Sequence, residues 1–122
     1  MTLKRMALEL GMGTDIQGGD YTKAATRAVQ NALRQNALVV ADAFDLPRDA
    51  MQVKILIGVQ KPDQVDTQTI AALLPYGSAT VSVEEGGMDT PNEAGTNITI
   101  MANAALVVYL DLPEGKSYGV PA

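Results

Sequence analysis

The chain has 122 residues, of which 47% are hydrophobic and only 4% aromatic, and its formal net charge is −5. This length suits one domain, residues 1–122, and the scarcity of aromatic residues requires a core of small aliphatic side chains. Because the basic residues are few and scattered, the composition excludes a protein that binds nucleic acid through the phosphate backbone.

The sequence contains no cysteine and no histidine, which excludes several kinds of chemistry together. Disulfides, thiolate nucleophiles, structural zinc sites and histidine-based proton transfer are all removed. Carboxylates, lysine, tyrosine and hydroxyl groups remain as reactive groups, and hard ions such as Mg²⁺ remain the only plausible metals, although no metal or cofactor is assigned. Glu9 interrupts the first apolar run, so we expect neither a signal sequence nor a membrane span, but a cytoplasmic protein.

The first predicted elements are a strand and a helix. Residues 3–10 alternate with a period of two, which predicts a strand that ends at Gly11. From Asp20 the period becomes helical, and alanines gather on one side of residues 20–34. Asp20 is a suitable N-cap for this helix, and its alanine-rich side permits close approach to a sheet.

The middle of the chain is less regular. Residues 36–50 form a connection in which 37–44 either continue the helix or make a separate turn before Leu46-Pro47. Residues 51–59 form a second strand. A short helix then follows, capped by Asp63 or Asp66 and extending to Leu74.

The last third of the chain is predicted to consist mainly of β-strands. Residues 78–87 alternate as a third strand, residues 88–96 form a polar loop, and residues 97–112 form a strand that is bent or bulged near Asn103, or two successive strands. Residues 113–122 form a tail in which Tyr118 is a candidate inter-subunit contact. The order βαβαββ predicts a two-layer α+β domain with helices on one face of a small sheet.

The second side of the last strand is also apolar, through Met101, Ala105 and Val107. Two helices of a small domain cannot cover both faces of a sheet. We therefore expect the second face to be buried against another copy of the chain, as a homo-oligomer.

The segment GMGTDIQGGD, residues 11–20, allows three interpretations. Phosphate binding is disfavoured, since Asp15 and Asp20 would repel the anion and no Gly-Lys-Ser/Thr is present. A second interpretation is a ligand site, with acidic side chains binding polar groups or a hard cation, while Lys23 and Arg27 engage an anionic or carbonyl group. A third is purely structural, with aspartates closing turns and glycines supplying positive φ angles. The candidate ligand-binding residues are Glu9, Gly11, Gly13, Asp15, Gln17, Gly18, Asp20 and Arg27, and the candidate catalytic residues are Lys23 and Asp15.

The segment ELGMGTDIQGGDYTKAATRAVQNAL resembles the opening of the Lin-type family of conserved hypothetical proteins, whose signature is GxGxDxHG. Gly11, Gly13, Asp15 and Gly18 match the signature, and Gln17 stands where it has histidine. IGVQKPDQVD, the Gly86-Gly87 pair and NITIMANAALVVYL also look similar, so the resemblance covers nearly the whole chain. The family implies no established activity. Glutamine can replace a hydrogen-bonding histidine but not one that carries a proton.

The segments DYTKAATRAV and KPDQVD also resemble one repeat of the ring-opening amidohydrolases, such as cyanuric acid hydrolase and barbiturase. Those enzymes use Ser/Lys pairs, and the resemblance nominates Lys23 with Ser78 or Ser82. Three functions therefore remain open. The chain is a small-molecule-binding protein with its site at the glycine loop and a subunit interface, a ring-opening hydrolase, or a structural or regulatory homo-oligomer without catalysis.

Overall fold

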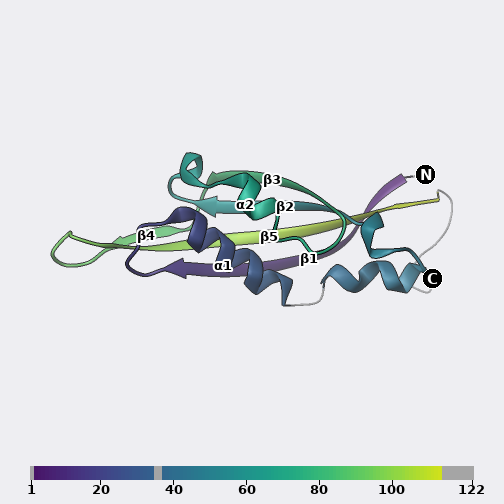
Figure 1. Cartoon of the computed structure of the whole chain (residues 1–122), viewed down its shortest axis with the longest axis horizontal. Helices are drawn as coiled ribbons and strands as arrows, with labels where there is room; N and C mark the ends of the chain where they lie inside the picture. The colour runs from purple at the N-terminus through teal and green to yellow at the C-terminus, as the bar shows by residue number, and fades with distance from the viewer. Residues whose placement is uncertain (1, 35–36, 114–122) are drawn as a thin grey trace.

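The computed structural model describes residues 2–34 and 37–113, and its principal elements are labelled in Figure 1. They are β1 (Thr2–Asp15), α1 (Tyr21–Leu33), β2 (Gln52–Val59), α2 (Thr67–Ala71), β3 (Ser78–Glu85), β4 (Met88–Pro91) and β5 (Ile98–Leu112). Short 3-10 helices η1 (Ala37–Phe44), η2 (Arg48–Ala50) and η3 (Pro62–Gln64) complete the connections. None of the helices in the described residues is long and apolar enough to span a membrane.

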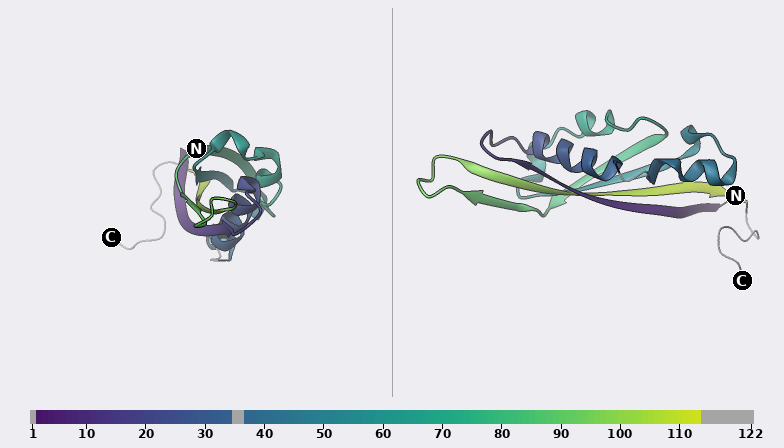
Figure 2. Two further views of the ribbon diagram at one scale, coloured as in Figure 1. Left: turned by 90° about the vertical axis from the view of Figure 1, so that its left-hand side faces the viewer. Right: turned by 90° about the horizontal axis from the view of Figure 1, so that it is seen from below.

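The strands form one mixed sheet in the order β1-β5-β2-β3. The central strand β5 is antiparallel to both β1 and β2, while β2 and β3 are parallel. Strand β4 pairs antiparallel with the first residues of β5, from Met88 opposite Met101 to Pro91 opposite Ile98. All the helices lie on one side of this sheet (Figure 2). The expected α+β class and two-layer arrangement are thus confirmed.

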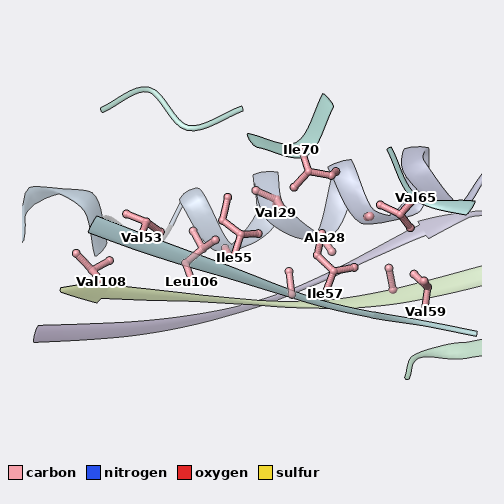
Figure 3. Packing of buried hydrophobic residues seen from close by; sticks show 14 of the residues in the cluster. Ala28, Val29, Val53, Ile55, Ile57, Val59, Val65, Ile70, Leu106 and Val108 are labelled. Atoms are coloured by element: carbon pink, nitrogen blue, oxygen red, sulfur yellow. The ribbon is translucent and has the colours of Figure 1, made fainter. Parts of the chain in front are cut away.

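The core lies between the sheet and the helices. Strand β2 alternates between buried and exposed residues, and its buried members Val53, Ile55, Ile57 and Val59 point towards α1 and α2 (Figure 3). The buried side of helix α1 consists mainly of alanines, and their small side chains let its backbone lie unusually close to β1. An added Cβ on Gly13 would lie 2.2 Å from the main-chain nitrogen of Ala28.

Helix α1 also covers the outer edge of β1. The Met12 N–H donates to Asn31 Oδ1 at 3.1 Å, and Arg27 Nη1 donates to the carbonyl oxygen of Thr14 at 2.7 Å. An edge strand normally exposes such main-chain groups to other chains. Here two of them are satisfied by the helix, which fixes the end of β1 beneath the start of α1.

Two strand boundaries differ from the sequence prediction. Strand β1 does not end at Gly11 but continues to Asp15, because β5 supplies partners for all of these residues, with Gly13 opposite Ala102 and Asp15 opposite Ile100. The expected polar loop over residues 88–96 contains β4, which the start of β5 stabilises by pairing.

The last strand is continuous from Ile98 to Leu112, as the first alternative allowed, but the irregularity lies elsewhere. The register shift falls in β1, between Arg5 and Ala7, instead of near Asn103. Residues 37–44 form a 3-10 helix separate from α1.

The short helix α2 begins at Thr67 and is capped by Asp66, whose side chain accepts from the N–H groups of Gln68 and Thr69. It ends at Ala71, before the predicted Leu74. Residues 114–122, including Tyr118, lie outside the described residues, so the expected contact of the tail stays a prediction.

Candidate functional site

The glycine loop and the start of α1 surround a shallow concavity of ≈ 430 Å³. Asp15 is the last residue of β1, and α1 begins at Tyr21, so the loop between them turns the chain from the sheet onto the helix layer. The concavity is lined by Asp15, Ile16, Gln17, Gly18, Lys23 and Arg27. Five of these six residues are among the candidates named from the sequence.

Asp15 is almost completely buried, with 3% of its surface exposed, and its carboxylate is bonded within the loop. Its Oδ2 accepts from the Asp20 N–H at 2.9 Å, and Lys23 Nζ lies 3.9 Å from its Oδ1. The hydrogen bond from Asp20 lowers the pKa of Asp15, aided by the Gly18 amide and the two nearby cations, while burial opposes this shift. Asp15 is therefore ionised at neutral pH and shapes the loop.

The polar groups that remain exposed in the concavity are mainly cationic or amide groups. Lys23 keeps half of its side chain exposed, and Arg27 and Gln17 are also exposed. The guanidinium of Arg27 already donates to Thr14, but it has five N–H donors in total. Lysine, arginine and glutamine together can bind a carboxylate, a phosphate or a polarised carbonyl oxygen.

A second hollow, of ≈ 220 Å³, adjoins the first on the side of β4 and β5. Its lining is uncharged and mixes polar with apolar residues, namely Ile16, Gln17, Thr90, Pro91, Asn92, Asn97 and Thr99. The loop residues Ile16 and Gln17 border both hollows, and Thr99 Oγ1 donates to the carbonyl oxygen of Ile16 at 3.1 Å. Sequence reasoning missed this hollow because it placed a loop where β4 lies.

The other candidate binding residues lie outside the concavity. Gly11 and Gly13 are strand residues beneath α1, where their lack of a side chain admits the helix backbone. Glu9 pairs with Leu106 of β5. It lies six residues before Asp15, which is about 20 Å along β1. Asp20 is the N-cap of α1 and accepts from the Lys23 N–H at 3.0 Å. These residues build the fold around the concavity and do not line it.

The nominated Ser/Lys pair is not formed within the chain. Ser78 and Ser82 alternate with Ala79, Val81 and Val83 on β3, and it is those three that pack against the core beneath the helices. The serines therefore lie on the sheet face turned away from the helices, whereas Lys23 belongs to α1 on the other side. The structure separates the nucleophile from its expected base.

One buried polar contact near the site was not anticipated. Tyr21 Oη donates a short hydrogen bond to Asp89 Oδ2, joining the first turn of α1 to β4. Burial, followed by the hydrogen bond to Asp89, raises the pKa of Tyr21 to about 12. Asp89 Oδ1 is buried and has no hydrogen-bond partner within the described ranges. Asp15 and Asp89 flank Ile100 from opposite sides, a relation that is visible only once β4 is paired with β5.

No group of three or more carboxylates in the described part of the chain is arranged to hold a metal ion. The acidic residues of the segment are dispersed, since Glu9 lies far along β1 while Asp15 and Asp20 bind main-chain amides. The exposed polar groups that border the concavity are accordingly those of Gln17, Lys23 and Arg27, and not a cluster of carboxylates.

Comparisons with known proteins give a family and a related structure. Residues 5–108 match the model of a family described as "Conserved hypothetical protein (Lin0512_fam)". The crystal structure of an FtsZ-like protein of unknown function from Nostoc punctiforme is similar, with 35% sequence identity and a TM-score of 0.80 over 92% of this chain and 99% of that chain. No curated protein matches the sequence.

Proposed function

We propose that this chain, which belongs to the Lin0512 family of conserved hypothetical proteins, is a small-molecule-binding protein whose ligand carries a carboxylate or phosphate group. The ligand would occupy the concavity between residues 15–18 and the first turns of α1. Lys23 and Arg27 would bind its anionic group, and Gln17 would hydrogen-bond a neighbouring polar atom. The cytoplasmic location expected from the sequence belongs to the same proposal.

One observation supports this choice above the others: Gln17, Lys23 and Arg27 border one concavity while the Asp15 carboxylate is already bonded to the chain. A hard cation would need several free carboxylate oxygens, and the acidic residues of the loop offer few. Asp15 and Asp20 offset the two cations, and the whole chain carries a net charge of −5, so an anion would be held by direct hydrogen bonds from Lys23 and Arg27 and not by a positive long-range potential.

The alternative functions predict different measurements. A ring-opening hydrolase would require a nucleophile near Lys23, and no serine among residues 2–34 and 37–113 lines the concavity. A structural or regulatory subunit would use the loop only to join β1 to α1 and would bind no ligand there. Completion of the site by a neighbouring copy stays a prediction.

Isothermal titration with inorganic phosphate and with malonate tests the proposal, using the full chain at low ionic strength. Lys23→Ala is expected to weaken binding about tenfold or more, because a hydrogen bond to a charged group contributes about 1.5–3 kcal/mol. Lys4→Ala is the matched control, since it removes the same charge from an exposed position near the other end of β1 and should leave affinity unchanged. Equal binding by Lys23→Ala and wild type, or no binding of either anion by wild type, would contradict the proposed site.

A further inference from the structure

The side of the sheet opposite the helices, which we call the open face, is apolar along β1 and polar along β3. Its large apolar members are Leu3, Leu8, Leu10 and Met12 of β1, Leu56 of β2, and Val107 of β5. Leu10 is 62% exposed and Met12 55%, and all helices lie on the other side of the sheet (Figure 2). Soluble monomers rarely expose a contiguous apolar patch of this extent unless it binds something.

The pairing register orders this face into rows that run across the strands. The central row contains Leu10, Ala105, Leu56 and Ser82. On one side of it, Leu8, Val107, Lys54 and Thr80 form the next row, and on the other side stand Met12, Asn103, Gly58 and Glu84. A basic group and an acidic group thus lie one row from the centre, on opposite sides.

We propose that the open face binds the open face of a second copy of this chain, related by a twofold axis that lies between the sheets and crosses the strands at the central row. This axis reverses the order of the rows. Lys54 then faces the partner's Gly58 on β2, and the partner's Glu84 lies beside that glycine on the neighbouring strand β3. The twofold symmetry forms the same lysine–glutamate pair a second time, with the two copies exchanged. Strand spacing of about 4.8 Å is within the reach of a lysine side chain.

The distribution of the other charges favours this axis over one along the strands. With the crossing axis, Arg5 faces the partner's Thr14, and Asp111 faces the partner's Thr99, so like charges do not meet. An axis along the strands would keep each row opposite itself and bring Lys54 beside the partner's Lys54. Either axis leaves the strands of the two sheets nearly aligned, which is the common arrangement in β-sandwiches, so the charges decide between them.

The dimensions agree with a stable dimer. Strands β1 and β5, of 14 and 15 residues, are about 46 and 50 Å long, and β2 and β3, of eight residues each, are about 26 Å long. At a spacing of about 4.8 Å the four strands present a flat area of about 700 Å². Typical stable complexes bury about 800 Å² from each partner. Gly58 and Ala105 also leave a hollow of ≈ 300 Å³ between Leu10, Leu56 and Glu84, and the axis places it opposite the partner's Leu56 and Lys54.

This inference is independent of the proposed ligand site, because the concavity lies at the end of β1 on the helix side. Either proposal can fail without the other. A dimer of this kind would leave the Lys23 and Arg27 side chains accessible.

Size-exclusion chromatography with light scattering tests the dimer on the full chain, with twice the mass of the 12.8 kDa chain as the expected result. Leu10→Lys is expected to raise the dissociation constant about a hundredfold or more, since it places a charge in the central row, where the axis brings Leu10 of β1 against the partner's Leu10. Val39→Lys is the matched control. It adds the same charge to an exposed apolar position of η1 on the helix side and should stay dimeric.

A charge exchange tests the register. Lys54→Glu and Glu84→Lys should each weaken the dimer, and the double variant K54E/E84K should recover most of the affinity. Circular dichroism on every variant shows whether the fold is retained. A monomeric wild type, a dimer that Leu10→Lys leaves intact, or a double variant weaker than both single variants would overturn the proposal. So would a dimer that forms only after residues 114–122 are removed, because the tail would then be the occupant of the open face.

Discussion

Replacing Gly13 by alanine adds one methyl group at the point where α1 lies closest to the sheet. The new Cβ would lie 2.2 Å from the Ala28 main-chain nitrogen, 2.4 Å from the Ala24 carbonyl oxygen and 2.6 Å from the Arg27 carbonyl carbon. All three are backbone atoms, so no side chain can rotate away and the helix itself must move. Overpacking of this kind costs about 1–3 kcal/mol, and contacts with backbone place Gly13→Ala towards the upper end.

The unfolded chain offsets part of this cost, because alanine has fewer conformations to lose than glycine, by about 0.4–1 kcal/mol. The net loss in the free energy of unfolding is then about 2 kcal/mol. For a domain of this length, that loss corresponds to a fall of about 8 °C in the midpoint of thermal unfolding.

Urea unfolding followed by circular dichroism measures the loss directly, provided that the slope of the transition is unchanged. Gly95→Ala serves as the control, since Gly95 has a φ of +70° and no atom of the described residues lies within 4 Å of an added Cβ. It should lose about 1 kcal/mol from backbone strain alone. If Gly13→Ala loses less than Gly95→Ala, the close approach of α1 to β1 is refuted.

Two further predictions concern the buried polar contacts. Tyr21→Phe removes the donor to the Asp89 carboxylate and should lower the free energy of unfolding by about 1–3 kcal/mol. Because the folded pKa of Tyr21 is raised from 10.0 to about 12, wild-type stability should be intact below pH 10 and fall between pH 10 and 12, whereas Tyr21→Phe lacks this fall. Asp15→Asn should lose about 1–2 kcal/mol at neutral pH by weakening the loop hydrogen bonds. The lowered pKa of Asp15 stabilises the fold above its usual value of 3.8, so the difference from wild type should shrink as the pH falls through and below that value. Urea titrations across pH check both, and a pH-independent difference would contradict the assigned contacts.

The helix and the central strands were predictable because their patterns are local. The alanine repeat after Asp20 predicts a helix over residues 20–34, and α1 runs from Tyr21 to Leu33 with the expected N-cap. The apolar run of residues 51–59 corresponds closely to β2. Both elements depend on periodicity over many residues, which a sequence displays directly.

The segments that were mispredicted depend on partners far away in the chain. Strand β4 is only four residues long, from Met88 to Pro91, and its sequence MDTP is polar, so only pairing with β5 makes it a strand. The Tyr21–Asp89 contact joins residues 68 positions apart and follows from that pairing. No local pattern carries such information, because strand propensity depends on the neighbouring strand.

The glycine segment shows how one pattern supports two interpretations. Gly11, Gly13 and Asp15 are spaced two apart, which is the period of a strand, and all three side-chain positions point towards α1. When the segment is interpreted as a loop, each of these residues becomes a candidate ligand-binding residue. When it is taken as a strand beneath an alanine helix, the two glycines are required for packing, and Asp15 is required to bond the turn that follows. The residues then left for chemistry are those that neither pack nor cap. Gln17, Lys23 and Arg27 meet this condition best, because their exposed side chains border the same concavity.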